Sequence, residues 1–328
     1  MSLDADTIVD RRRMRRKLTF WRVFAVLLAI CAVIAVGAAT RAPGIGILTG
    51  QSAGSIARVT ITGLIRTDRE RVEALEKLGT SPAKAVIVHI NSPGGTTSGS
   101  EELYDSLKRL KEQKPTAVVV DGLAASGGYI AALAADYIIA GETSLVGSIG
   151  VLFQYPNFTD ALKTLGIRVE EIKSSPLKAA PNGFEPTSPE ARAAIESIVM
   201  DSYAWFRALV KSRRQLDEAA LDRVADGRVF TGRQGVGLKL VDEHGDERTA
   251  VAWLAKEKNI DPKTPVRDYR LRDRLSDLPF LHTAAIATLD ALGLSGFARH
   301  VEEWGAVRAI ERLNLDGLLA LWHPPTAN

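Results

Sequence analysis

Two short glycine-rich loops carry the side chains best suited to chemistry. Residues 91–95 (NSPGG) follow the apolar run 85–90 (AVIVHI), and residues 125–129 (ASGGY) come soon after the apolar run 117–120 (AVVV). A serine at a turn from a strand into a helix presents its hydroxyl where backbone N–H groups converge, and the helix dipole favours negative charge there. Ser126 therefore suits the role of a nucleophile in acyl transfer, which needs an accessible Oγ and donors for the developing oxyanion.

The two loops are more informative together than singly. Taken alone, each is typical of an ordinary glycine-rich turn. Neighbouring strand-to-helix loops of one parallel sheet, however, open on the same edge, where ligands usually bind. Gly94 or Gly95 is then expected to bring a second N–H group close, since only glycine allows such an approach without a side chain in the way.

No histidine stands out as a base for Ser126. His89 lies within an apolar run and is predicted to be a partnered core residue, His244 lies in the acidic turn VDEHGD, and the other three histidines lie in the C-terminal region. A Ser/His/Asp triad stays open, but nothing in the pattern favours it.

The elements that must position these loops alternate between strands and helices, which predicts an α/β layered fold. Strands are expected at residues 58–62, 85–90, 117–120, 137–140, 146–152 and 167–172. Helices are expected at residues 68–78, from Ser98 to about 111, 128–134 and from Ser188 to about 212. The second helix is expected to start with a capping box, Ser98 with Glu101, and the last with Ser188 as N-cap before Pro189.

The N-terminal region reads as a membrane anchor. Residues 23–39 form an uncharged apolar run of 17 residues, which as a helix covers roughly 26 Å of the hydrocarbon core. Seven basic residues precede it within residues 1–22, so the positive-inside rule leaves the N-terminus cytoplasmic and exports the rest. A cleaved signal peptide is the alternative, because small residues end the run. Cys31, the single cysteine, lies inside it, so the exported part has neither a disulfide nor a cysteine nucleophile.

The charge of the chain excludes some function classes. The net charge is +3, but residues 1–22 alone carry +4 and the remainder carries −1, so the charge orients the chain and predicts no nucleic-acid partner. We find no cluster with metal-ligand spacing and no phosphate-binding glycine loop, and we therefore expect no metal and no cofactor.

Five ordered motifs resemble one known family. They are INSPGG at 90–95, AASGGYIAALAAD at 124–136, VGSIGV at 146–151, KSSPLKAAPNGFEPTS at 173–188 and DGRVFTGRQG at 226–235. Together, over about residues 55–260, they are similar to the signal peptide peptidase A family (peptidase family S49) in its short, single-unit bacterial form. The resemblance implies a Clp-protease/crotonase-like α/β fold behind one N-terminal transmembrane helix. Two positions depart from the family pattern: Ile130, where a second aromatic residue is common, and Lys239, which interrupts a Gly-Leu-Val-Asp run.

The resemblance also implies a Ser/Lys dyad, with Ser126 as the nucleophile and Lys178 as the general base. It implies that Ser148 orients the lysine amine. An ordinary lysine is protonated at neutral pH, so Lys178 would need apolar surroundings that lower its pKa. The choice of Lys178 rests on the family motif, because Lys163, Lys173 and Lys211 are rivals by residue type alone.

The oxyanion hole implied in this way consists of the N–H of Gly127 and that of Gly94 or Gly95. Implied substrates are signal peptides left in the membrane, with apolar or small side chains in extended form. The family forms homo-oligomeric rings, octameric by resemblance, in which one subunit can supply the lysine to its neighbour's serine.

The expected organisation has four parts. Residues 1–17 are a cytoplasmic basic tail, 18–40 the anchor, 41–262 the peptidase domain on the outer face of the cytoplasmic membrane, and 263–328 a helical extension with amphipathic stretches. Two other functions remain open: a crotonase-like acyl-thioester enzyme, which would use the same oxyanion geometry, and a catalytically silent membrane scaffold.

Overall fold

The computed structural model describes residues 21–22, 54–271 and 318–321. The chain divides into two units, residues 1–51 and 52–328. Within the first unit only Trp21 and Arg22 are described, and both are helical, so the predicted anchor otherwise lies outside the described residues. In the part of the chain that is described, no helix combines the length and apolarity needed to cross a membrane.

The second unit is built on a mixed sheet, which confirms the predicted α/β class. β1 (Ile56–Ile65), β2 (Ala85–Thr96), β3 (Thr116–Ala125), β4 (Tyr137–Ala140) and β8 (Glu243–His244) run parallel in that order, and β9 (Val266–Asp268) pairs parallel with β1. β5 (Leu145–Gly147) pairs parallel with the end of β3 and antiparallel with β7 (Val229–Thr231). β10 (Leu318–Leu321) lies antiparallel between the end of β2 and β6 (Leu152–Phe153).

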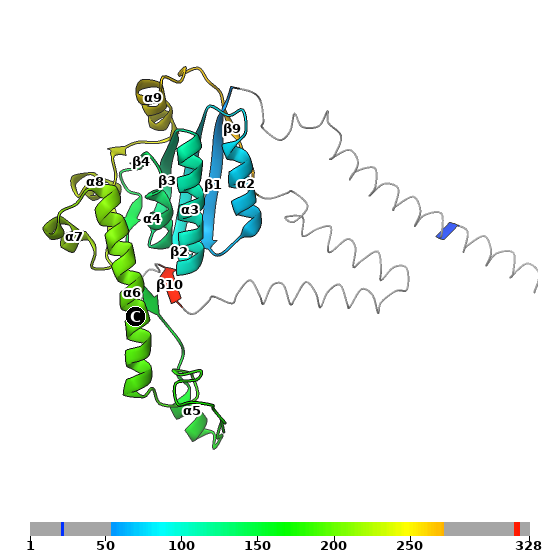
Figure 1. The fold of residues 1–328 in the computed structure, drawn as a ribbon, viewed down its shortest axis with the longest axis vertical. Coiled ribbons are helices and arrows are strands. Elements are labelled where there is room, and N and C mark those ends of the chain that lie inside the picture. Colours follow the sequence, from blue (N-terminus) through cyan, green and yellow to red (C-terminus); the bar gives the residue numbers. More distant parts are fainter. Residues whose placement is uncertain (1–20, 23–53, 272–317, 322–328) are drawn as a thin grey trace, which may run out of the picture. The chain divides into compact units, whose positions relative to one another are not determined.

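Both faces of the central sheet are buried (Figure 1). Val86 and Val88 belong to the core that includes residues of α2 (Arg69–Gly79), α3 (Thr97–Gln113) and α4 (Gly127–Ala132). Ile87, between them, belongs to a second core with Leu254 of α9 (Glu247–Lys258). The continuous apolar run of β2 is explained by this arrangement, because consecutive side chains of a strand point to opposite faces.

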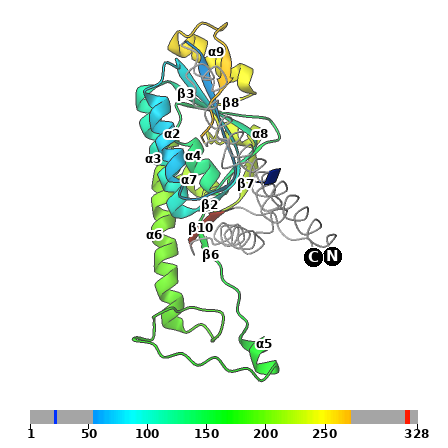
Figure 2. The same ribbon diagram turned by 90° about the vertical axis from the view of Figure 1, so that its right-hand side faces the viewer.

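A long helix carries a projecting segment. α6 (Pro189–Arg214) begins with Ser188 as its N-cap and Pro189 in the first turn, as predicted. Near its other end, Arg213 donates to the backbone oxygens of Leu133 and Ala135, at 2.7 Å each, and so fastens α6 to the end of α4. Residues 154–188, here called the arm, contain α5 (Thr159–Thr164) and extend away from the sheet in both views (Figures 1 and 2).

The remaining helices are short and follow α6. α7 (Glu218–Val224) begins at the N-cap Asp217, and α8 (Gly232–Gly237) begins with a capping box of Thr231 and Gln234.

Three sequence expectations about elements are wrong. The N-cap of α3 is two residues earlier than predicted, because Thr96, the last residue of β2, accepts a hydrogen bond from the Gly99 N–H, and Ser98 lies inside the first turn. Residues 167–172 form no strand; they belong to the arm, where no neighbouring strand pairs with them, and Ile172 is fully exposed. The strand expected at 146–152 is two strands, β5 and β6, because Ser148 has a φ of 52° and ends the first.

The region expected to be a helical extension contains two described strands. β9 adds to the edge of β1, and β10 makes a strand of residues 318–321, within the amphipathic stretch expected at 315–322. The amphipathic stretches expected at 281–294 and 301–313 lie outside the described residues.

Candidate active site

Ser126 occupies a strained turn between β3 and α4. Its φ of 53° with a ψ of −116° is a conformation that residues with a Cβ rarely adopt. The N–H of Ser126 donates to the Gly147 backbone oxygen at 2.8 Å, and the Ser126 oxygen accepts from the N–H groups of Tyr129 and Ile130 in the first turn of α4. These bonds hold the turn, so the strain is maintained by the surrounding structure.

Ser126 is 1% exposed, contrary to the accessible hydroxyl expected from the sequence, because α4 and the loop after β2 pack around the turn. Its Oγ has no hydrogen-bond partner among the described residues. A buried hydroxyl without a partner is costly in a folded protein and marks a candidate functional group. Gly127 is the first residue of α4, where a backbone N–H has no acceptor within the helix.

The loop at the end of β2 packs directly against this turn. Ser92 pairs with Ala124 in the parallel register, and a Cβ added at Gly128 would lie 2.6 Å from the Ser92 backbone oxygen. Glycine is therefore required at position 128 for α4 to approach the loop. The two loops singled out in the sequence meet, as predicted from their places at the ends of adjacent strands.

The two candidate oxyanion glycines differ. Gly94, with a φ of 97°, donates its N–H to the Ser92 Oγ at 3.0 Å, and Ser92 in turn donates to the Gly63 oxygen. Gly95 lies against β1, where an added Cβ would be 1.8 Å from the Ile65 oxygen. The Gly94 N–H thus has a partner, and Gly95 is paired with Ile65 of β1 on one side and with Ala320 of β10 on the other. The shaping role of Ser92 was not foreseen from the sequence.

The strand β10 pairs with the backbone of this loop. In the register of β10, Leu319 is opposite Thr96, Ala320 opposite Gly95 and Leu321 opposite Gly94, while β6 pairs with the other edge of β10. A segment far along the chain thus occupies an extended position directly on the glycine loop. No sequence signal marked residues 318–321 for this place.

Ser148 lies next to Ser126 in the fold. Ala125 of β3 pairs with Gly147 of β5, and Ser126 and Ser148 each follow one residue later. Ser148 is 7% exposed, and its N–H donates to the Arg228 oxygen at 2.8 Å.

Lys178 is not brought to Ser126 within the chain. It lies in a turn of the arm, is exposed, and makes no side-chain hydrogen bond or ion pair with any residue that the structure describes. Lys173, a rival candidate base, bridges Glu171 and Glu185, and these two carboxylates raise its pKa, which keeps it charged. The rivals Lys163 and Lys211 are paired with Asp160 and Glu218 respectively.

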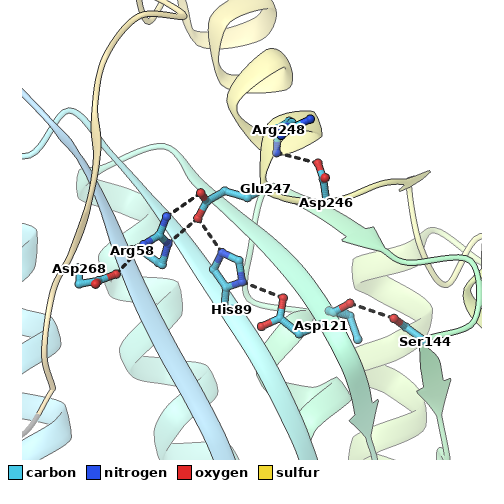
Figure 3. Close-up of polar contacts among 9 residues, drawn as sticks. Arg58, His89, Asp121, Ser144, Asp246, Glu247, Arg248 and Asp268 are labelled. Carbon is cyan, nitrogen blue, oxygen red and sulfur yellow. Dashed lines mark hydrogen bonds and ion pairs between the residues drawn. The ribbon is translucent and has the colours of Figure 1, made fainter.

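His89 lies in a separate polar network (Figure 3). Its Nδ1 is 2.8 Å from the Asp121 Oδ1 and its Nε2 is 2.9 Å from the Glu247 Oε2, while Arg58 bonds both Glu247 and Asp268. Both ring nitrogens are thus engaged away from Ser126, which confirms that the histidine is partnered, although it is half-buried at the sheet surface and is not part of the core. His244 is exposed at β8, as expected of a surface turn.

Among the residues that are described, no group of three or more His, Cys, Asp or Glu side chains is placed to hold a metal ion.

Two family models match this chain. The model of peptidase family S49 matches residues 108–261, and that of Clp protease matches residues 66–142. The proposed protease slr0021 of Synechocystis sp. is 34% identical over 209 residues, which are 63% of this chain and 76% of that protein.

Two further relatives are longer. The proposed signal peptide peptidase SppA of Enterococcus faecium is 34% identical over 56% of this chain and 54% of its own length. The chloroplastic serine protease SPPA of Arabidopsis thaliana is 32% identical over 54% of this chain, which spans only 26% of that protein. Among solved structures, a ClpP1 mutant from Listeria monocytogenes covers 58% of this chain and 92% of its own, with 16% identity and a TM-score of 0.40.

Proposed function

This chain belongs to peptidase family S49, a family of serine peptidases, and on that premise we propose that it cleaves apolar peptides with Ser126 as the nucleophile and Lys178 as the general base. The observation that carries the proposal is the Ser126 Oγ, which is buried, unpartnered and held in a strained turn at the start of a helix. Such strain is costly and persists where the surrounding structure requires it, typically at functional sites.

The chemistry proceeds by acyl transfer. Neutral Lys178 accepts the Ser126 hydroxyl proton as the Oγ attacks the peptide carbonyl carbon, and the resulting ammonium gives that proton to the leaving amine. Water then attacks the acyl-enzyme, Lys178 takes its proton, and the Ser126 oxygen leaves and is reprotonated. The N–H groups of Gly127 and of Gly94 or Gly95 stabilise the oxyanion, and Ser148 holds the lysine amine.

A second copy of the chain completes the site. Lys178 is exposed on an arm that leads away from α4, while the Ser126 Oγ lacks a hydrogen-bond partner in its own chain as far as that chain is described. Apart from Trp21 and Leu64, every exposed large apolar side chain in the described part lies on the arm or on the first half of α6. Exposed apolar side chains concentrated in one part of a chain are typical of an interface. We infer a homo-oligomeric ring in which each arm delivers Lys178 to the Ser126 of its neighbour.

Substrates bind in extended form at the glycine loop. The pairing of β10 with residues 94–96 supports this, because it demonstrates that this edge accepts an antiparallel strand. We propose that the substrates are signal peptides and similar apolar peptides. The basic cluster and apolar run of residues 1–39 support anchoring in the cytoplasmic membrane, with the peptidase domain on its outer side.

The decisive experiment is labelling by a fluorophosphonate probe together with peptide cleavage. The wild-type oligomer is expected to label and to cleave, Ser126→Ala to do neither, and Lys178→Met to lose cleavage and most labelling. Labelling that persists in Ser126→Ala contradicts the assigned nucleophile. A wild-type oligomer that neither labels nor cleaves peptides contradicts the peptidase proposal, and thioester turnover would then favour an acyl-thioester enzyme and its absence a silent scaffold.

A further inference from the structure

The turn that carries Lys178 is closed at its base by four polar side chains. Lys173 Nζ lies 2.6 Å from Glu171 Oε2 and 2.5 Å from Glu185 Oε1. One ammonium therefore bridges the two ends of the turn, residues 171–173 and 182–185. Asn182 Nδ2 adds contacts to the same two carboxylates, at 3.3 Å and 3.1 Å. Glu171, Lys173, Asn182 and Glu185 are called the base cluster below.

Asn182 also fixes the backbone on both sides of itself. Its Oδ1 accepts from the N–H groups of Phe184, at 2.8 Å, and Glu185, at 3.2 Å, and its Nδ2 donates to the Ala179 oxygen at 3.3 Å. Ala179 directly follows Lys178 and has a φ of 59°. The N–H of Lys178 donates to the Ser175 oxygen. The Asn182 bond to Ala179 therefore links the base cluster to the residue that follows Lys178.

The burial of the two lysines is opposite. The Lys173 side chain is 17% exposed although it belongs to a projecting arm, whereas Lys178 is exposed. Two further hydrogen bonds tie this part to the start of the arm, from the Phe158 N–H to the Gly183 oxygen at 2.8 Å and from Asn157 Nδ2 to the Glu185 oxygen at 3.3 Å. The apolar side chains around it, including Ile172, Leu177 and Phe184, are exposed. In the absence of an apolar core, polar bonds have to determine the shape of the turn.

We propose that Lys173 and Asn182 are positioning residues that hold Lys178 in the direction required to reach the Ser126 of a neighbouring subunit. The inference rests on the proposed function and adds to it two residues that never touch the substrate. Without the bridge, the two ends of the turn are no longer held together, and Lys178 can move. A misplacement of about 1 Å of a catalytic group can cost about 100-fold in rate.

Lys173→Met tests the bridge, because it replaces the apolar part of the side chain with one of similar size and removes the ammonium. Lys163→Met is the matched control: this lysine is also on the arm and also paired, with Asp160 at 3.7 Å, but its side chain is 71% exposed and it lies on α5. The readouts are kcat and KM for a peptide substrate, the rate of fluorophosphonate labelling, and oligomer size by light scattering.

We expect Lys173→Met to lower kcat and the labelling rate about 10- to 100-fold, with KM within about twofold and the oligomer intact. Lys173→Arg is expected to restore most of the rate, since a guanidinium can bridge two carboxylates. Asn182→Ala is expected to show the same split between kcat and KM, and it replaces Lys173→Met as the test if that variant does not assemble.

Three results would overturn the inference: a kcat within twofold of wild type in an assembled Lys173→Met or Asn182→Ala, a loss equal to that of Lys163→Met, or a Lys173→Arg no better than Lys173→Met. These results are distinct from failure of the proposed function. If the proposed function fails, the wild-type oligomer itself does not label. If only the positioning role fails, the wild type labels, and the base-cluster variants label at the same rate.

Discussion

Ser126 and Ser148 lie side by side on neighbouring strands, each one residue beyond the register pair of Ala125 and Gly147, and both have a left-handed φ, of 53° and 52°. The two turns are bonded in sequence: the Ser126 N–H donates to the Gly147 oxygen, and the Ser148 N–H donates to the Arg228 oxygen. The paired strands β3 and β5 thus end together, and each is followed directly by a serine.

The strain at Ser126 predicts a difference in stability between two substitutions at this position. Ser126→Gly and Ser126→Ala both remove the hydroxyl, but only glycine adopts a φ of 53° with a ψ of −116° without a steric cost. We expect Ser126→Gly to be more stable than Ser126→Ala by about 1–2 kcal/mol, measured by denaturant unfolding. Equal stability of the two variants would contradict the backbone strain assigned to position 126.

A dyad shared between subunits predicts complementation. Ser126→Ala and Lys178→Met are each expected to be inactive alone. When equal amounts are unfolded and assembled together, about one quarter of the sites combine an intact serine with an intact neighbouring lysine, so about one quarter of the wild-type activity should return. If both residues acted within one chain, the mixed oligomers would stay inactive.

Gly95 is expected to tolerate no side chain. In Gly95→Ala the new Cβ would lie 1.8 Å from the Ile65 oxygen, so β1 and β2 would have to move apart beside the site. We expect loss of activity by at least about 100-fold together with a lower Tm. Gly122→Ala on β3 is the control, because its Cβ would meet only Asn91 Oδ1, at 3.5 Å, and its activity should remain near that of wild type.

Glu247 predicts an acid-dependent loss of stability. The hydrogen bonds from Arg58 hold the pKa of the Glu247 carboxyl below its ordinary value of 4.5, against the opposing effect of burial. A lowered pKa in the folded state stabilises the protein above pH 4.5, and this contribution is lost as the pH falls through the folded-state pKa.

Wild type should therefore lose its advantage in unfolding free energy over Glu247→Gln as the pH is lowered below 4.5. The measurement is urea unfolding across the acid range. Glu257→Gln, at the exposed pair with Lys256 on the same helix, is the control and should differ little from wild type at any pH. A constant gap between wild type and Glu247→Gln would contradict the role assigned to Arg58.

The position of β10 predicts competition with peptide substrates. Proline at position 320 removes a backbone N–H and disfavours strand pairing opposite Gly95. We expect Ala320→Pro to lower KM for an extended peptide about 3- to 10-fold, with kcat near that of wild type, because the backbone of the glycine loop is then open more of the time. Ala320→Ser keeps the N–H and should behave like wild type. An unchanged KM in Ala320→Pro would mean that peptides bind elsewhere.

Much of the fold could be predicted because its signals are local. The continuous apolar run of β2 reflects a strand buried on both faces, and Ser188 with Pro189 marked the start of α6 correctly. The helix start assigned to Ser98 was wrong because β2 continues to Thr96, which then takes the capping position. Periodicity does not report such competition between neighbouring elements.

The sequence by itself determined that Ser126 sits at a strand-to-helix turn, in the second of two glycine loops, because strand and helix patterns depend on residues close together in the chain. Only the tertiary structure decided that Ser148 lies beside Ser126, that residues 318–321 lie on the glycine loop, and that Lys178 projects on an arm. These relations join residues far apart in the sequence. They depend on strand register and on which surfaces are left uncovered, and neither is encoded in any short segment.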